Sequence, residues 1–74
     1  MNCLMKRTPV NSSNLASVGY DPASQILEIE FNTGTVYQYF DGPQSEHIAL
    51  MGADSHGSYF YHNIRNDYRY KRIQ

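Results

Sequence analysis

A chain of 74 residues has room for one hydrophobic core, and a chain of this size buries only about 60% of the surface that it exposes when unfolded. Its hydrophobic content of 41% suffices for that core, whereas no segment approaches the ~20 apolar residues that cross a membrane. Cys3 is the single cysteine, which excludes an internal disulfide, and the first residues contain no apolar stretch of signal-peptide length. We therefore expect a cytoplasmic protein rather than a secreted or membrane-spanning one.

The basic residues are concentrated at the two ends of the chain. The formal net charge is −1, yet residues 11–64 contain six acids and no Lys or Arg. Such an asymmetry says more about partners than the total charge does. Two interpretations stay open, namely solvated basic tails or a contact with an anionic partner. The basic positions are Lys6, Arg7, Arg65, Arg69, Lys71 and Arg72.

An irregular N-terminal stretch is predicted to come before the regular structure. Pro9 pushes the residue before it towards extended geometry, and the run of Asn and Ser at 11–14 is typical of turns. We therefore expect residues 1–12 to be irregular or partly disordered.

An antiparallel meander is the clearest feature of the pattern. Residues 26–31 alternate between apolar and acidic positions, as a half-buried strand does. Residues 32–34 fit a three-residue hairpin loop with Gly34 in the left-handed conformation. The predicted strands run over 15–20, 26–31 and 35–40.

The hairpin loop fixes the register of the predicted sheet, because a slip of one residue would turn every side chain to the other face. Ala16, Val18 and Tyr20 of the first strand then share one apolar face with the paired residues of the other two. This face needs a cover, so core packing is the expected role of Tyr37 and Tyr39, while the alternative that they stack on RNA bases stays open. The predicted pairs are Phe31–Thr35, Ile29–Tyr37 and Leu27–Tyr39.

Two short helices are predicted to cover that face. Pro43 suits the first position of a helix that ends near Gly52, and Ser55 has the character of an N-cap for a second helix that ends near Ile64. The expected fold is a single α+β domain over residues 1–74. It comprises a three-stranded antiparallel β-meander with two short C-terminal helices packed on one face.

No pattern in the sequence indicates catalysis, a metal or a cofactor. Cys3 lies in the irregular end without a partner histidine, and His47, His56 and His62 lack the spacing of a zinc motif. The acids at 28 and 30 are ordinary outward positions of a strand, and no phosphate-binding glycine loop occurs. We therefore expect a protein that is not an enzyme.

Four segments in order resemble the KTSC domain, a small family found at the C-terminus of some lysyl-tRNA synthetases and as a free-standing bacterial protein. The resemblance covers residues 6–74 and implies a compact single domain. Two positions depart from it, since His56 stands where Lys is frequent and Arg69 stands where Pro is common. The segments are Ser17-Val18-Gly19-Tyr20-Asp21, Tyr37-Gln38-Tyr39-Phe40, Gly57-Ser58-Tyr59-Phe60 and Tyr68-Arg69-Tyr70-Lys71-Arg72-Ile73.

The resemblance and the basic C-terminus together suggest an accessory domain that binds RNA or single-stranded nucleic acid. Tyrosines interleaved with Arg and Lys combine stacking surfaces with cations for phosphates. The alternative for Tyr68 and Tyr70 is that they anchor the C-terminus to the core. The N-terminal cations join the others only if the two ends converge. The candidate residues are Lys6, Arg7, Tyr61, Arg65, Tyr68, Arg69, Tyr70, Lys71 and Arg72.

A rival hypothesis is a protein-interaction or self-association module. An open three-stranded sheet leaves its first and third strands as edges, and an edge can pair with a partner protein or another copy. The second face of the predicted sheet is mixed, since Ile26, Val36 and Phe40 accompany its polar residues. That mixed face favours the rival hypothesis.

Overall fold

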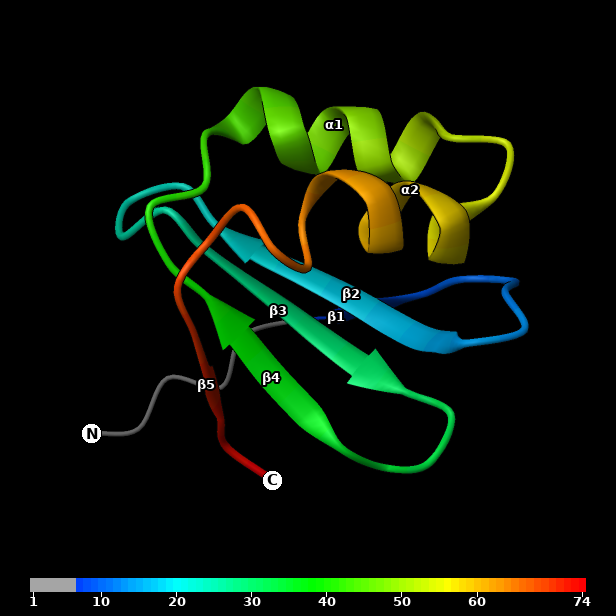
Figure 1. Cartoon of the computed structure of the whole chain (residues 1–74). Coiled ribbons are helices and arrows are strands. Elements are labelled where there is room, and N and C mark those ends of the chain that lie inside the picture. The colour runs from blue at the N-terminus through cyan, green and yellow to red at the C-terminus, as the bar shows by residue number, and fades with distance from the viewer. Residues whose placement is uncertain (1–6) are drawn as a thin grey trace.

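Residues 7–74, which the computed structural model describes, form a five-stranded antiparallel sheet with two helices across one of its faces (Figure 1). Every strand pairs with its neighbours in the chain, so the sheet is a simple meander in the order β1-β2-β3-β4-β5. The elements are β1 (Arg7–Pro9), β2 (Leu15–Asp21), β3 (Ile26–Phe31), β4 (Val36–Tyr39), α1 (Gln44–Gly52), α2 (His56–Asn63) and β5 (Tyr70–Arg72).

The α+β class is confirmed, but the expected number of strands was wrong. β1 pairs with β2 inside the stretch predicted to be irregular, and β5 pairs with β4. Each added strand has three residues, which is too short to show an alternating pattern, and Pro9 is typical of a sheet edge. The edges are therefore β1 and β5, and the strands predicted to be edges are covered on both sides. Residues 1–6 lie outside the described residues.

The register predicted for the central hairpin is confirmed. Leu27 lies opposite Tyr39 and Ile29 lies opposite Tyr37. The loop between these strands closes with a bond of 2.8 Å from the Phe31 amide to the carbonyl oxygen of residue 35. Gly34 has a φ of +92°, the conformation for which glycine was predicted there.

The first predicted strand deviates in one place. The pairing of β2 with β3 shifts between Leu15 and Ser17, so Leu15 lies opposite Phe31 and is fully buried. Ala16, predicted on the covered face, is only half-buried. Such a β-bulge inserts one extra residue into a strand, and no turn residue in the sequence indicates its position.

Both helices lie where the sequence placed them. α1 begins one residue after Pro43, and the Ser55 hydroxyl accepts a hydrogen bond of 3.2 Å from the Ser58 amide at the start of α2. The two helices pack on the sheet, and together with β2, β3 and β4 they enclose the hydrophobic core. Its buried members are Leu15, Val18, Leu27, Ile29, Tyr39, Leu50, Phe60 and Ile64.

Glu46 of α1 joins the second helix and the segment that leads to β5. Its carboxylate accepts hydrogen bonds from the hydroxyls of Tyr59 and Tyr68, the second at 2.8 Å. Burial, followed by the bond to Glu46, raises the pKa of Tyr68 to about 12. The alternative in which Tyr68 anchors the C-terminal segment is thus the one that the structure supports.

The buried tyrosines predict a loss of stability at high pH. Burial raises the pKa of Tyr39 from 10.0 to about 12, with further contributions from neighbouring tyrosines. Because the folded state holds the proton more tightly than the unfolded state, its stabilisation is complete below pH 10 and is lost between about pH 10 and 12. Urea unfolding across this range should show a steep fall for the native protein.

The Tyr39→Phe variant removes one ionising group and should lose stability less steeply. Tyr70→Phe removes an exposed hydroxyl and serves as the matched control, with a fall like that of the native protein. An identical fall in Tyr39→Phe and the native protein would contradict this assignment.

Candidate functional site

A groove of about 600 Å³ lies between α2 and the helix-facing side of the sheet. We call it the aromatic groove. It collects residues from the loop before β2, the β3–β4 hairpin, α2 and its end, and β5. The lining residues are Ser13, Asn14, Phe31, Asn32, Thr33, Tyr37, Tyr39, Gly57, Phe60, Tyr61, Arg65, Asn66 and Tyr70.

Aromatic rings in mutual contact form much of its wall. The Tyr70 ring centroid lies 5.5 Å from that of Tyr37 and 5.7 Å from that of Tyr39, and Tyr37 meets Phe31 edge-on at 5.8 Å. Tyr39 is 4% exposed, whereas Tyr70 is 59% exposed and Tyr61, on α2, 55%. The groove therefore offers fixed rings below and open rings at its margins, an arrangement on which a flat ligand can stack.

The core assignment is thus confirmed for Tyr39 and incomplete for Tyr37. Tyr37 is half-buried and lines the groove, because β5 extends the sheet beyond the part covered by Phe60 and its neighbours in α2. Stacking on RNA bases was the alternative left open for Tyr37, but its helix-facing strand position favoured burial, and it was not among the candidate site residues. Recognition of β5 would have provided the missing signal.

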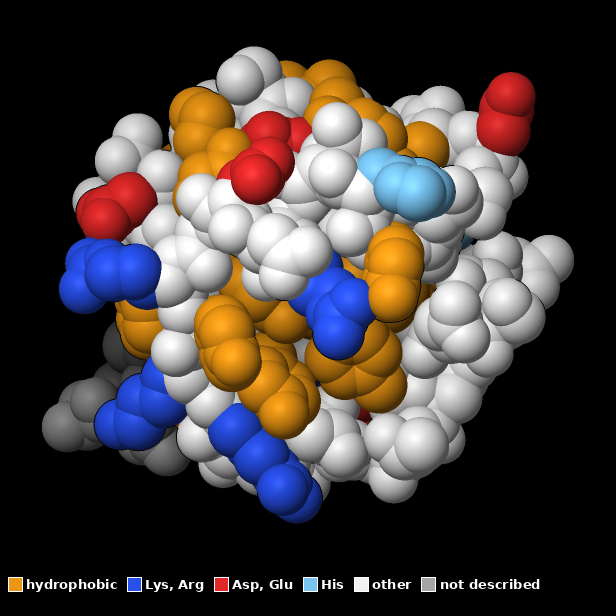
Figure 2. All heavy atoms as spheres, in the orientation of Figure 1, with side chains coloured by type: hydrophobic (Ala, Val, Ile, Leu, Met, Phe, Trp, Pro, Cys, Tyr) orange, Lys and Arg blue, Asp and Glu red, His pale blue; other side chains and the backbone are white. Residues whose placement is uncertain are grey.

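The groove is positively charged although the whole chain is not. The Arg65 guanidinium lies over the Tyr61 ring, 4.6 Å from its centroid. Arg72 is the cross-strand neighbour of Tyr37, so its side chain lies on the same face of the sheet as that ring. Of the residues described, those that line the groove include no Asp or Glu. Figure 2 shows a basic side chain beside a hollow edged by hydrophobic ones, with further basic side chains below and to the left of it on the same face.

The remaining C-terminal candidates point elsewhere or are paired. Arg69 forms an exposed ion pair of 3.0 Å with Asp41 and lies 5.9 Å from the Phe40 ring centroid. Lys71 pairs with Gln38, so its side chain belongs to the face of the sheet away from the helices. Tyr61, Arg65, Tyr70 and Arg72 are the candidates that the fold brings together.

Arg7 belongs to a different surface. It lies on the edge strand opposite β5, about 19 Å away at the usual strand spacing, and its side chain is on the face without helices. The basic ends therefore do not converge at Arg7, and Lys6 lies outside the described residues.

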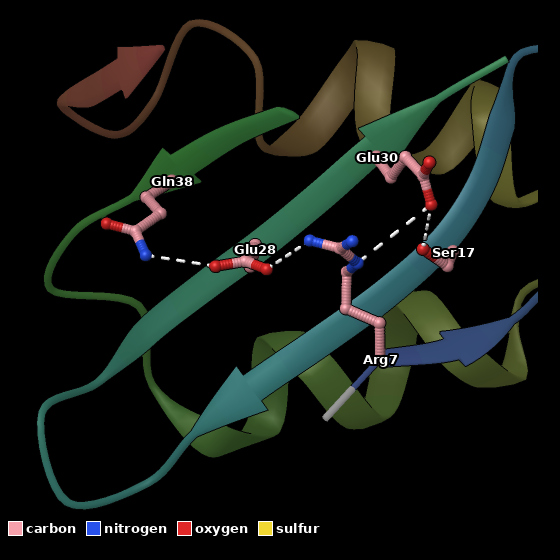
Figure 3. A network of polar contacts seen from close by, with 5 residues as sticks. All are labelled: Arg7, Ser17, Glu28, Glu30 and Gln38. Atoms are coloured by element: carbon pink, nitrogen blue, oxygen red, sulfur yellow. Dashed lines mark hydrogen bonds and ion pairs between the residues drawn. The ribbon is translucent and has the colours of Figure 1, made fainter. Parts of the chain in front are cut away.

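Figure 3 shows what Arg7 does instead. Its guanidinium binds the Glu28 carboxylate and lies 3.9 Å from that of Glu30. Gln38 donates to Glu28 at 3.0 Å and Ser17 donates to Glu30 at 2.7 Å. Since Glu28 is only 5% exposed, this network neutralises a charge that the sheet has buried.

His47 and His56 each contact another group within the fold. His47 stacks on Tyr20 with ring centroids 5.0 Å apart, and burial lowers its pKa from 6.5. The Nδ1 atom of His56 lies 2.8 Å from the Leu50 carbonyl oxygen. Within residues 7–74, no three His, Cys, Asp or Glu side chains cluster as metal ligands would, and no helix there has the length and hydropathy to span a membrane.

Comparison with known proteins places this arrangement in a family. The model of the KTSC domain matches residues 11–68. The chain belongs to the KTSC domain family. The crystal structure of a KTSC domain protein from Yersinia pestis superposes with a TM-score of 0.92 at 38% identity, over 96% of this chain and 100% of that one. The expected family is thus confirmed, and the five-stranded sheet has a solved counterpart.

Relatives of this KTSC domain occur alone and within larger proteins. An uncharacterised protein of Stutzerimonas stutzeri is 47% identical over 93% of this chain and 99% of its own length. A lysine–tRNA ligase of Nostoc sp. is 35% identical over 73% of this chain, but the match spans only 10% of the ligase. The family model carries no indication of catalysis.

The Arg7 network predicts a variant that loses stability but not function. Arg7→Met removes the guanidinium and leaves the buried Glu28 carboxylate with Gln38 as its remaining partner, which should lower the free energy of unfolding by about 1–3 kcal/mol. Urea unfolding measures this loss.

The double variant Arg7→Met, Glu28→Gln removes the orphaned charge as well and should recover part of the loss. An unchanged stability of the single variant would contradict a structural role for Arg7.

Proposed function

We propose that this KTSC domain binds single-stranded nucleic acid, RNA in the first place, through the aromatic groove. The observation that supports this most directly is the contact between Arg65 and the exposed Tyr61 ring, beside further aromatic rings and apart from acids. Aromatic rings stack on bases of any sequence, and arginines bind the phosphates that connect them.

The depth of the rings favours a single strand over a duplex. Tyr37 is half-buried and lies in the groove, so a base can reach it only after leaving its own stack. Bases in loops, bulges and unpaired ends meet that condition, whereas bases inside a helix do not. The expected ligand is an unpaired segment of RNA.

The family supports RNA as the partner. Relatives of this domain form part of proteins named lysine–tRNA ligase, whose substrate is an RNA. The domain spans about a tenth of those proteins, so it would act there as an accessory part. In this chain we propose the same non-enzymatic role, in the cytoplasm.

Affinity is expected to be modest. Among the described residues, Arg65 lines the groove and Arg72 lies on the same face of the sheet as Tyr37, and the chain as a whole is slightly acidic. Two phosphate contacts give a slope of about −1.4 for the logarithm of the affinity against that of the salt concentration. Binding of this kind steers an RNA that other parts of an assembly hold more tightly.

Self-association through a sheet edge has weaker support. The apolar residues that suggested an interaction surface on the second face of the sheet are largely covered, because Val36 is buried and Ile26 and Phe40 are half-buried. The free edges are now β1 and β5, each of three residues, which offer few backbone groups to a partner strand.

The proposal predicts that reversing a positive charge weakens RNA binding only when the charged side chain lies on the groove side of the domain. Arg65→Glu and Arg72→Glu should each weaken binding of a labelled single-stranded RNA by about tenfold or more, since each removes a charge-assisted contact. Fluorescence anisotropy across a salt series measures both the affinity and its slope.

Lys71→Glu is the matched control. It makes the same change of charge on the same strand but on the opposite face, so its affinity should stay within about twofold of the native value. Equal weakening by the Lys71 and Arg72 variants would show attraction to overall charge alone. No binding at low salt would overturn the proposed function.

A further inference from the structure

The two ends of the aromatic groove differ in chemistry. Ser13, Asn14, Asn32 and Thr33 gather where the loop before β2 meets the β3–β4 hairpin, and all four are neutral and polar. Tyr70 lines the groove from the far end of β4, where it pairs with Tyr39. A bound molecule therefore meets amide and hydroxyl groups at one end and aromatic and cationic groups along the rest.

Asn32 is held in one orientation at the polar end. Its backbone amide donates to the Asn14 carbonyl oxygen at 3.0 Å. The side-chain nitrogen Nδ2 donates to the carbonyl oxygens of Ser12 at 3.3 Å and Ser13 at 2.8 Å. Both side-chain N–H groups are thus used within the loop, and Oδ1 is left to accept a hydrogen bond from a ligand.

The groove has room for one nucleotide. Its volume of about 600 Å³ falls in the range of about 300–1,000 Å³ that is usual for small-molecule sites. Tyr37 contacts Phe31, which precedes Asn32 in the chain, so a base stacked on Tyr37 would have its outer edge near the polar end, with Arg65 in the same groove for its phosphate. Asparagine is a usual partner of base edges in recognition of nucleic acids.

We infer that the groove holds one unstacked base that bears an exocyclic amino group, and that the Asn32 Oδ1 atom accepts a hydrogen bond from that group. This inference rests on the proposed function and adds the class of base. Adenine carries such an amino group on C6, cytosine on C4 and guanine on C2. Hypoxanthine and uracil have the shapes of adenine and cytosine but carry a carbonyl oxygen in place of that group, so two acceptors would face each other.

Mononucleotides test this inference in two pairs that differ chiefly at that group, CMP with UMP and AMP with IMP. Titration of the isotope-labelled 74-residue protein, followed by the chemical shifts of the groove residues, gives the affinity for each. We expect CMP and AMP to bind at least about fivefold more tightly than UMP and IMP. Equal affinities within both pairs would overturn the inference.

Asn32→Ala should bring each ratio close to one, because it removes the acceptor. Asn63→Ala, at an exposed asparagine of α2 that does not line the groove, is the matched control and should keep the preference. Should the Asn32 variant fold poorly, competition of oligo(C) and oligo(U) for the native protein measures the same preference without any substitution. Oligomers that compete equally would count against the inference.

The result is separable from that of the proposed function. RNA binding that depends on Arg65, together with equal affinities within both mononucleotide pairs, would refute the base preference and leave the proposed function standing. Absence of RNA binding at low salt would refute both.

Discussion

The register of the β3–β4 hairpin is the constraint on which the rest of this molecule depends. A three-residue loop closed by Gly34 places Tyr37 and Tyr39 on the same face as Leu27 and Ile29. Because side chains alternate along a strand, both tyrosines must then face the helices.

Helix α2 covers that face incompletely, and the groove is the consequence. Phe60 packs edge-on against Tyr39, with ring centroids 5.3 Å apart, and closes the core there. β5 adds Tyr70 to the same face beyond the reach of Phe60, so Tyr37 stays half-buried between the core and solvent. The row of aromatic rings is thus part of the core at Tyr39 and forms an accessible surface at Tyr37 and Tyr70.

Much of this could be predicted from the sequence, and the two missed strands share one cause. Periodicity, turn residues and an N-cap found the central strands, the hairpin register and both helices, since each is encoded within a few neighbouring residues. β1 and β5 escaped because three residues carry no period, and their pairing is decided by β2 and β4. Arg7 lies on β1 and Arg72 on β5, at opposite edges of the sheet, and the gathering of cations at both chain ends gave no warning that they lie on different surfaces.

The central claim is that nucleic acid binds the helix-facing groove and not the opposite face. Amide chemical shifts of the isotope-labelled protein, recorded during titration with a single-stranded RNA, test it most directly. Binding in the groove should give salt-sensitive changes at Asn32, Tyr37, Tyr61, Arg65 and Tyr70, with little change around Arg7 and Glu28. Changes centred on the Arg7 network, or no changes at low salt, would contradict it.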